Sequence, residues 1–169
     1  AADNGLDLDG IEPGLAAAAG RLARDRAVVD AVGQLGDRYL ADGPCLVHGD
    51  FFPGSWLRSD LGLRIIDPEF AFWGDPEFDV GVALGHLALA ARPATEARGW
   101  LEAYTKGRGA PHLDLELVAR FAAVEVIRRL VGVAQLPLPD ERGDRVPLLA
   151  RARGALLEGD PGLLFGEST

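Results

Sequence analysis

Three carboxylates, Asp50, Asp67 and Glu69, lie within the short segment LVHGDFFPGSWLRSDLGLRIIDPEF of residues 46–70. The rest of this segment is apolar or turn-forming, which is typical of strands joined by short loops. Two carboxylates held about 4 Å apart repel by roughly 4 kcal/mol at an effective dielectric near 20. If the fold brings these acids together, a cation is expected between them.

The composition indicates one globular domain that does not act on nucleic acid or membranes. The chain has 169 residues, of which 48% are hydrophobic and 25% charged. Its net charge of -9 argues against a general nucleic-acid or anionic-membrane binder, since such surfaces need clustered cations. An acidic surface tolerates a cationic or neutral small substrate better, although solubility alone also explains the charge.

Cysteine content and apolar runs restrict the cellular setting. Cys45 is the only cysteine, so neither a disulfide framework nor a thiolate zinc site is available, and a reducing, cytoplasmic setting is expected. The longest apolar windows, residues 15–19 and 80–91, are far shorter than the roughly 20 residues of a membrane span. The chain begins with alanine rather than methionine, which indicates a cropped or processed start.

The periodicity of apolar residues predicts an α+β domain that is mostly α-helical. Residues 1–12 are polar and acidic and are expected to be a linker or frayed N-terminal segment, followed by one lobe over residues 13–169. Residues 15–41 predict one or two helices. Beyond them we expect a strand at 45–47, a hairpin from 55–59 and 63–66, a loop at 69–79, and helices at about 80–91, 94–105, from Asp114 onward and 144–157.

His48-Gly49-Asp50, Ser55 and Asp67 resemble the catalytic core of the protein-kinase-like phosphotransferases, in the aminoglycoside phosphotransferase branch. The resemblance implies the C-terminal lobe of a protein-kinase-like fold, with a small β-hairpin carrying the catalytic loop. It also implies that Asp50 orients the hydroxyl of a small-molecule acceptor and accepts its proton. ATP would be the co-substrate, and Mg²⁺ would be the cation expected above, because phosphoryl transfer needs chiefly positioning and charge neutralisation.

Within that family, Ser55 and Asp67-Pro68-Glu69 are similar to the corresponding residues of the methylthioribose kinases. The resemblance implies that Asp67 and Glu69 bind Mg²⁺ with assistance from Ser55. The segment VIRRLVGVAQ (126–135) is similar to the double-arginine helix of those kinases, whose arginines contact the substrate, so Arg128 and Arg129 are candidate substrate-binding residues.

Further residues bear on how the loop is held in place and on which acceptor is bound. His48 and Asp79 are expected to support the catalytic loop rather than react. Phe51-Phe52 replaces the Leu-His pair usual in relatives. This departure leaves the acceptor open among methylthioribose, aminoglycosides, fructosamines and choline-type compounds.

Simpler structural roles are available for several of these residues. Ser55 is a common turn residue, and Asp79 has the position of a helix N-cap. Arg128 and Arg129 are spaced to form surface ion pairs with Glu125. His86, inside an apolar helix, is expected to be a buried histidine with a hydrogen-bond partner.

A kinase of this fold also needs a lysine on an upstream nucleotide-binding lobe. The only lysine, Lys106, follows Asp67, and the 47 residues before His48 predict a linker and helices. The N-terminal nucleotide lobe is therefore expected to be absent from this chain, which alone would transfer phosphate poorly. A catalytically silent binding module is the main alternative, and a carboxylate-pair hydrolase is a weaker one, because nothing places a sugar between Asp50 and Asp67.

Overall fold

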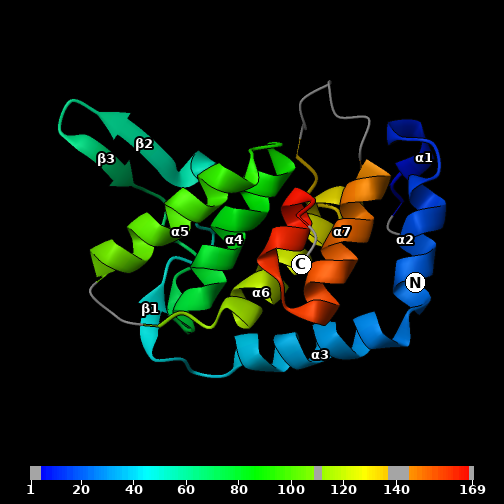
Figure 1. The fold of residues 1–169 in the computed structure, drawn as a ribbon, viewed down its shortest axis with the longest axis horizontal. Helices are drawn as coiled ribbons and strands as arrows, with labels where there is room; N and C mark the ends of the chain where they lie inside the picture. The colour runs from blue at the N-terminus through cyan, green and yellow to red at the C-terminus, as the bar shows by residue number, and fades with distance from the viewer. Residues whose placement is uncertain (1–4, 109–111, 137–144, 168–169) are drawn as a thin grey trace.

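The computed structural model describes residues 5–108, 112–136 and 145–167 and is mostly helical (Figure 1). The helices are α1 (Leu8–Ile11), α2 (Leu15–Arg24), α3 (Arg26–Leu40), α4 (Pro76–Leu89), α5 (Ala94–Arg108), α6 (Leu115–Val131) and α7 (Arg145–Glu158). The strands are β1 (Cys45–Val47), β2 (Trp56–Ser59), β3 (Gly62–Ile65) and β4 (Phe72–Gly74), and two short 3-10 helices cover Pro53–Ser55 and Pro161–Phe165. Figure 1 shows the β2–β3 hairpin projecting from one end of the helical body, with α1 and α2 at the other end.

Helix α4 lies at the centre of the hydrophobic core because it is apolar on nearly all sides. Its small residues let it approach α6 closely. A Cβ atom added to Gly81 would lie 2.6 Å from Cβ of Phe121 and 2.9 Å from the backbone nitrogen of Ala122. At Gly85 it would lie 3.0 Å from the carbonyl oxygen of Ala122. The two helix backbones therefore meet with no room for a side chain between them.

The two small antiparallel sheets hold the loop segments of the chain. Strands β1 and β4 pair with Val47 opposite Phe72, so residues 48 and 71 leave the same end of this sheet side by side. All of residues 48–71, including the β2–β3 hairpin, are inserted between these two paired strands. The sequence did not predict β4, whose three residues lie inside the expected loop at 69–79.

Most helices agree with the sequence, with local corrections. The predicted region 15–41 forms two helices, separated at Asp25, whose carboxylate accepts a hydrogen bond from the amide of Ala27. Helix α4 begins at Pro76 rather than near residue 80, which is consistent with the preference of proline for a first helical turn. Helix α6 follows its expected N-cap Asp114. Helix α7 begins at Arg145. The predicted helix included residue 144, which lies outside the described residues.

Within residues 1–12, expected to be a linker or frayed segment, Leu8–Ile11 form the short helix α1. Leu8 is buried in the main core, and Asp7 caps α1 by accepting a hydrogen bond from the amide of Gly10. The carboxylate of Glu12 accepts hydrogen bonds from the amides of Arg145 and Val146, the first two residues of α7. This long-range cap was missed because its donors lie more than 130 residues away along the chain. Across the described ranges, no helix is both long enough and apolar enough to cross a membrane.

The close α4–α6 contact leads to a stability prediction. Gly81→Ala should lower the free energy of unfolding by about 1–3 kcal/mol, because its methyl group must push the α6 backbone away. Gly99→Ala on α5 is the matched control, since nothing lies within 4 Å of an added Cβ there. It should raise stability by about 0.4–1 kcal/mol. Urea unfolding of both variants measures the difference, and a Gly81→Ala protein as stable as wild type would contradict the close contact.

Candidate functional site

The loop His48-Gly49-Asp50 is fixed to the first turn of α4 by Asp79. The Asp79 carboxylate accepts hydrogen bonds from the backbone amide of His48 at 2.6 Å and from that of Gly49 at 3.1 Å. Burial raises the pKa of Asp79, and the two amide hydrogen bonds act in the opposite direction. Gly49 has φ 85° and passes so close to Phe70 that a Cβ atom would collide with the Phe70 carbonyl group. The path of the loop is therefore specified from two sides.

The His48 ring connects this loop to the segment that carries Asp67. Its Nδ1 atom lies 3.4 Å from the amide nitrogen of Asp50, and its Nε2 atom lies 2.9 Å from the carbonyl oxygen of Ile66. A neutral ring protonated at Nε2 satisfies both contacts, accepting from Asp50 and donating to Ile66. The structure thus places His48 as a bridge between the loop and the residue preceding Asp67.

Ser55 is buried beneath the same loop. Its hydroxyl group donates to the carbonyl oxygen of Asp50 at 2.9 Å, and its own carbonyl oxygen accepts from the amide of Ile66 at 3.0 Å. These contacts close the turn that returns the chain to the hairpin. The hydroxyl proton is used in loop geometry, while oxygen lone pairs remain for another ligand.

The carboxylate of Asp50 faces an arginine of α6. Its Oδ1 atom lies 3.6 Å from Nη2 of Arg129, whose side chain is only 10% exposed. The guanidinium carbon of Arg129 also lies 5.6 Å from the centroid of the Phe52 ring, and its Nη1 atom donates to the carbonyl oxygen of Ala134 at 3.2 Å. The loop and α6 therefore bring Asp50 and Arg129 close together.

The buried carboxylate of Glu125 joins Arg128 and Arg129 of α6. It accepts hydrogen bonds from Nε of Arg129 at 2.7 Å, from Nε of Arg128 at 2.9 Å and from Nε2 of His86 at 3.0 Å. Burial by itself raises the pKa of Glu125, but the His86 and Arg129 hydrogen bonds and the charges of both arginines outweigh it and lower the pKa to about 2. His86 is a buried histidine with a partner, as the sequence predicted.

Asp50, Glu125, Arg128 and Arg129 border one cavity of about 540 Å³. The remaining walls are mainly apolar and aromatic and come from α3, α4, α6 and the loop before β4; they include Val32, Leu35, Tyr39, Phe70, Phe78, Val82, Phe121 and Val124. The cavity therefore combines a group of charged side chains, here called its charged end, where a hydroxyl group can meet a carboxylate, with mainly apolar walls. This division suits a small ligand with a polar head and an apolar substituent.

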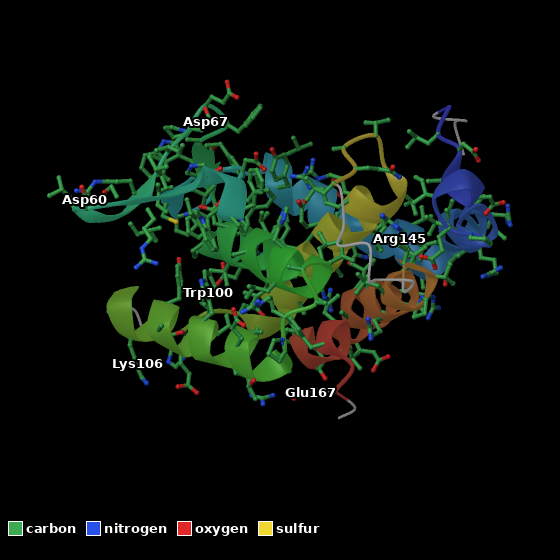
Figure 2. The ribbon with its side chains drawn as sticks, turned by 90° about the horizontal axis from the view of Figure 1, so that it is seen from above. Asp60, Asp67, Trp100, Lys106, Arg145 and Glu167 are labelled. Carbon is green, nitrogen blue, oxygen red and sulfur yellow. The ribbon has the colours of Figure 1, made fainter. Side chains whose placement is uncertain are left out.

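Asp67 and Glu69 lie outside this cavity. Both are exposed and make no hydrogen bond or ion pair with any residue that the structure describes. Asp67 has φ 68°, a left-handed conformation that is uncommon for a residue other than glycine. Figure 2 shows it on the same side as Asp60 of the hairpin and opposite Lys106.

The expected crowding of Asp50, Asp67 and Glu69 into one acidic group is not found. In the described part of the chain no three histidine, cysteine, aspartate or glutamate side chains gather as a metal site. Asp50 lies beside Arg129 of α6, whereas Asp67 and Glu69, which follow β3, are exposed. Two free carboxylates remain at positions 67 and 69, and hard oxygen donors of this kind fit Mg²⁺ when phosphate and water complete its coordination.

The sequence missed the two features that shape the charged end. Glu125 was considered only as a surface partner of the arginines, but it is buried and binds both. Phe52, noted only as a departure from relatives, packs 5.0 Å from the ring of His86 and beneath Arg129. The only available signal was the placement of a charged Glu-x-x-Arg-Arg pattern inside an otherwise apolar helix.

The family model described as "phosphotransferase enzyme family" matches residues 5–116, about two thirds of the chain. The chain belongs to this family. The predicted resemblance to these phosphotransferases is thereby confirmed, and with it the expectation of a kinase-like fold.

Curated relatives agree with this assignment. A methylthioribose kinase of Exiguobacterium sibiricum is 30% identical over 89% of this chain and 46% of its own length. One of a Geobacillus species is 32% identical over 70% of this chain and 37% of its own length, and one of Yersinia pestis is 44% identical over 40% of this chain and 17% of its own. The chain thus spans about half, or less, of the length of the curated relatives it matches.

The lowered pKa of Glu125 leads to a prediction for acid stability. A carboxylate whose folded-state pKa is lowered from 4.5 to about 2 stabilises the fold above pH 4.5 and loses that effect as the pH falls toward 2. The contribution at neutral pH is about 3 kcal/mol. Between pH 4.5 and 2, the unfolding free energy of wild type should therefore fall by about 3 kcal/mol more than that of Glu125→Gln. Urea unfolding across this range measures both profiles, and parallel profiles would refute the prediction.

Proposed function

We propose that this chain is the acceptor-binding lobe of an ATP- and Mg²⁺-dependent kinase that phosphorylates a hydroxyl group of a small molecule, with methylthioribose as the first choice of acceptor. The observation that carries the proposal is the cavity that Asp50 shares with Arg128 and Arg129. It is supported by the family assignment and by the names of the relatives.

The cavity walls favour a neutral acceptor over a polycationic one. Two guanidinium groups stand at the charged end, and the two nearby carboxylates, Asp50 and Glu125, balance their charge. An aminoglycoside carries several ammonium groups, which the arginines would repel. A sugar with a methylthio substituent would place its hydroxyl groups toward Asp50 and its apolar group against the side chains of α3 and α4.

In the proposed reaction Asp50 orients the acceptor hydroxyl and accepts its proton as the oxygen attacks the γ-phosphorus atom of ATP. A new bond forms between that oxygen and phosphorus, and the bond from phosphorus to the departing ADP oxygen breaks. Asp79 and His48 act on Asp50 indirectly, by holding the backbone of its loop. Such positioning is the main contribution that a protein makes to phosphoryl transfer.

Asp67 and Glu69 would hold the Mg²⁺ ion, with Ser55 as an assisting oxygen donor. When bound, Mg²⁺ neutralises charge on the nucleotide phosphates. The free carboxylates at 67 and 69 are suited to this task because no described residue occupies their oxygen atoms. Ser55 is less free, since its hydroxyl group already donates to the loop.

A nucleotide-binding lobe would be the partner of this chain. Lys106, the only lysine in the sequence, is exposed on α5, pairs with Glu102 at 3.5 Å and lies opposite Asp67 in Figure 2. It is therefore unsuited to bind the phosphates beside Asp67. We expect the lysine and phosphate-covering loop to come from a separate lobe, and residues 1–169 alone to transfer phosphate poorly. A silent binding module is the alternative if that lobe is never supplied.

Asp50→Asn tests the proposed base. In the full-length gene product this variant should lose about 10²–10⁴-fold in kcat for methylthioribose, because the amide cannot accept the hydroxyl proton. Asp60→Asn, at the exposed tip of the hairpin, is the matched control and should keep wild-type turnover. Coupled measurement of ADP release provides kcat, and an Asp50→Asn enzyme with wild-type turnover would rule out the assigned role.

The acceptor class is tested by binding, without any nucleotide. Residues 1–169 should bind methylthioribose about tenfold more tightly than ribose, since burial of the methylthio group against the apolar wall contributes roughly 1–2 kcal/mol. Titration calorimetry with methylthioribose, ribose, kanamycin and choline compares the candidate classes. Tighter binding of kanamycin or choline than of methylthioribose would reject the neutral acceptor.

A further inference from the structure

The carboxylate of Glu125 is shared between three donors in a defined way. Its Oε1 atom accepts from Nε of Arg129 at 2.7 Å, from Nε2 of His86 at 3.0 Å and from Nη2 of Arg128 at 3.1 Å. Its Oε2 atom accepts from Nε of Arg128 at 2.9 Å. Glu125 is only 5% exposed, so these charges interact at low effective dielectric.

Arg129 lies between two carboxylates at unequal distances. Its Nε atom is 2.7 Å from Glu125, whereas its Nη2 atom is 3.6 Å from Asp50. The nearer contact is a full hydrogen bond, and the farther one is longer than a normal hydrogen bond. Glu125 therefore holds the guanidinium group while leaving the Asp50 oxygen largely free.

We propose that Glu125 is a positioning residue that holds Arg128 and Arg129 and restrains Arg129 from closing onto Asp50. This inference rests on the proposed kinase function, because it assigns to Glu125 the preservation of a free base. Phe52 supports the arrangement from the other side, where its ring lies against the Arg129 guanidinium and against His86. Arg128, which is 46% exposed, is held at the outer side of the cluster and faces the cavity.

Removing the charge of Glu125 should free Arg128 and should also let Arg129 approach Asp50. In Glu125→Gln the amide keeps one oxygen acceptor but presents N–H groups to donors that already carry hydrogens. Arg128 then loses its partner, and Asp50 becomes the only carboxylate within reach of Arg129. Arg129 should move onto Asp50, so acceptor binding and proton acceptance both weaken.

The first experiment observes the arginines directly and does not require activity. In ¹⁵N-labelled residues 1–169, the Nε–H signals of Arg128 and Arg129 should exchange slowly with solvent in wild type and at least about tenfold faster for Arg128 in Glu125→Gln. Arg128→Lys and Arg129→Lys assign the two signals. Glu77→Gln is the matched control, because Glu77 is also a buried glutamate but accepts only from the amide of Asp114, outside the cavity.

The second experiment separates positioning from stability. In the full-length product, Glu125→Gln should lose about 10- to 100-fold in kcat/KM for methylthioribose, with the KM for ATP unchanged, whereas Glu77→Gln keeps wild-type values. In an Arg129→Lys background, Glu125→Gln should cause little further loss, since the residue through which it acts is already altered.

Either of two results overturns the proposal: unchanged Nε–H exchange in Glu125→Gln, or a loss of kcat/KM that is fully additive with that of Arg129→Lys. A wild-type protein that phosphorylates no sugar overturns the proposed function instead. In that case the exchange of the arginine signals alone decides whether Glu125 positions them.

Discussion

The close approach of α4 and α6 is the constraint on which the remaining structure depends. Gly81 and Gly85 let the two backbones meet, and this contact sets the register between the residues that each helix carries. On α4, Asp79 holds the His48-Gly49-Asp50 loop and His86 reaches Glu125. On α6, Glu125 and Arg129 reach back toward that loop. A change in spacing between these helices would displace the contacts of Asp79 with the loop, of His86 with Glu125 and of Arg129 with Asp50.

The positive and negative charges at the charged end of the cavity balance one another. Two buried or half-buried arginines face two carboxylates, and the Glu125 carboxylate is almost inaccessible to water. A buried ionic group is costly to desolvate, and it is strongly destabilising once one partner is removed. The paired carboxylate of Glu125 contributes to stability and also fixes the positions of Arg128 and Arg129.

Local sequence patterns predicted most of the helices and the family resemblance of the loop, because both depend on residues close together in the chain. The period of apolar residues predicted α5 and α6, and Asp114 marked the start of α6. The His48-Gly49-Asp50 loop was recognised from a few adjacent residues. The strand β4 was missed because it has three residues and exists only through pairing with β1, more than 20 residues away.

The cavity could not be predicted from the sequence either. Its wall on α3 depends on how that helix packs against α4 and α6, and its charged residues, Asp50 and Arg129, lie almost 80 residues apart in the chain. Of the three acids in residues 46–70, Asp50 lines the cavity, whereas Asp67 and Glu69 follow the hairpin and are exposed.

The contribution of α3 to the cavity wall has an evolutionary consequence. Val32, Leu35 and Tyr39 line the cavity, yet α3 carries none of the residues to which the proposal assigns proton acceptance, Mg²⁺ binding or acceptor binding. In the proposed kinase, the α3 residues that contact the acceptor would therefore be separate from the residues that carry out the reaction. A protein derived from this one could accept a bulkier or smaller sugar through substitutions on α3 alone, because the residues proposed to react would stay unchanged.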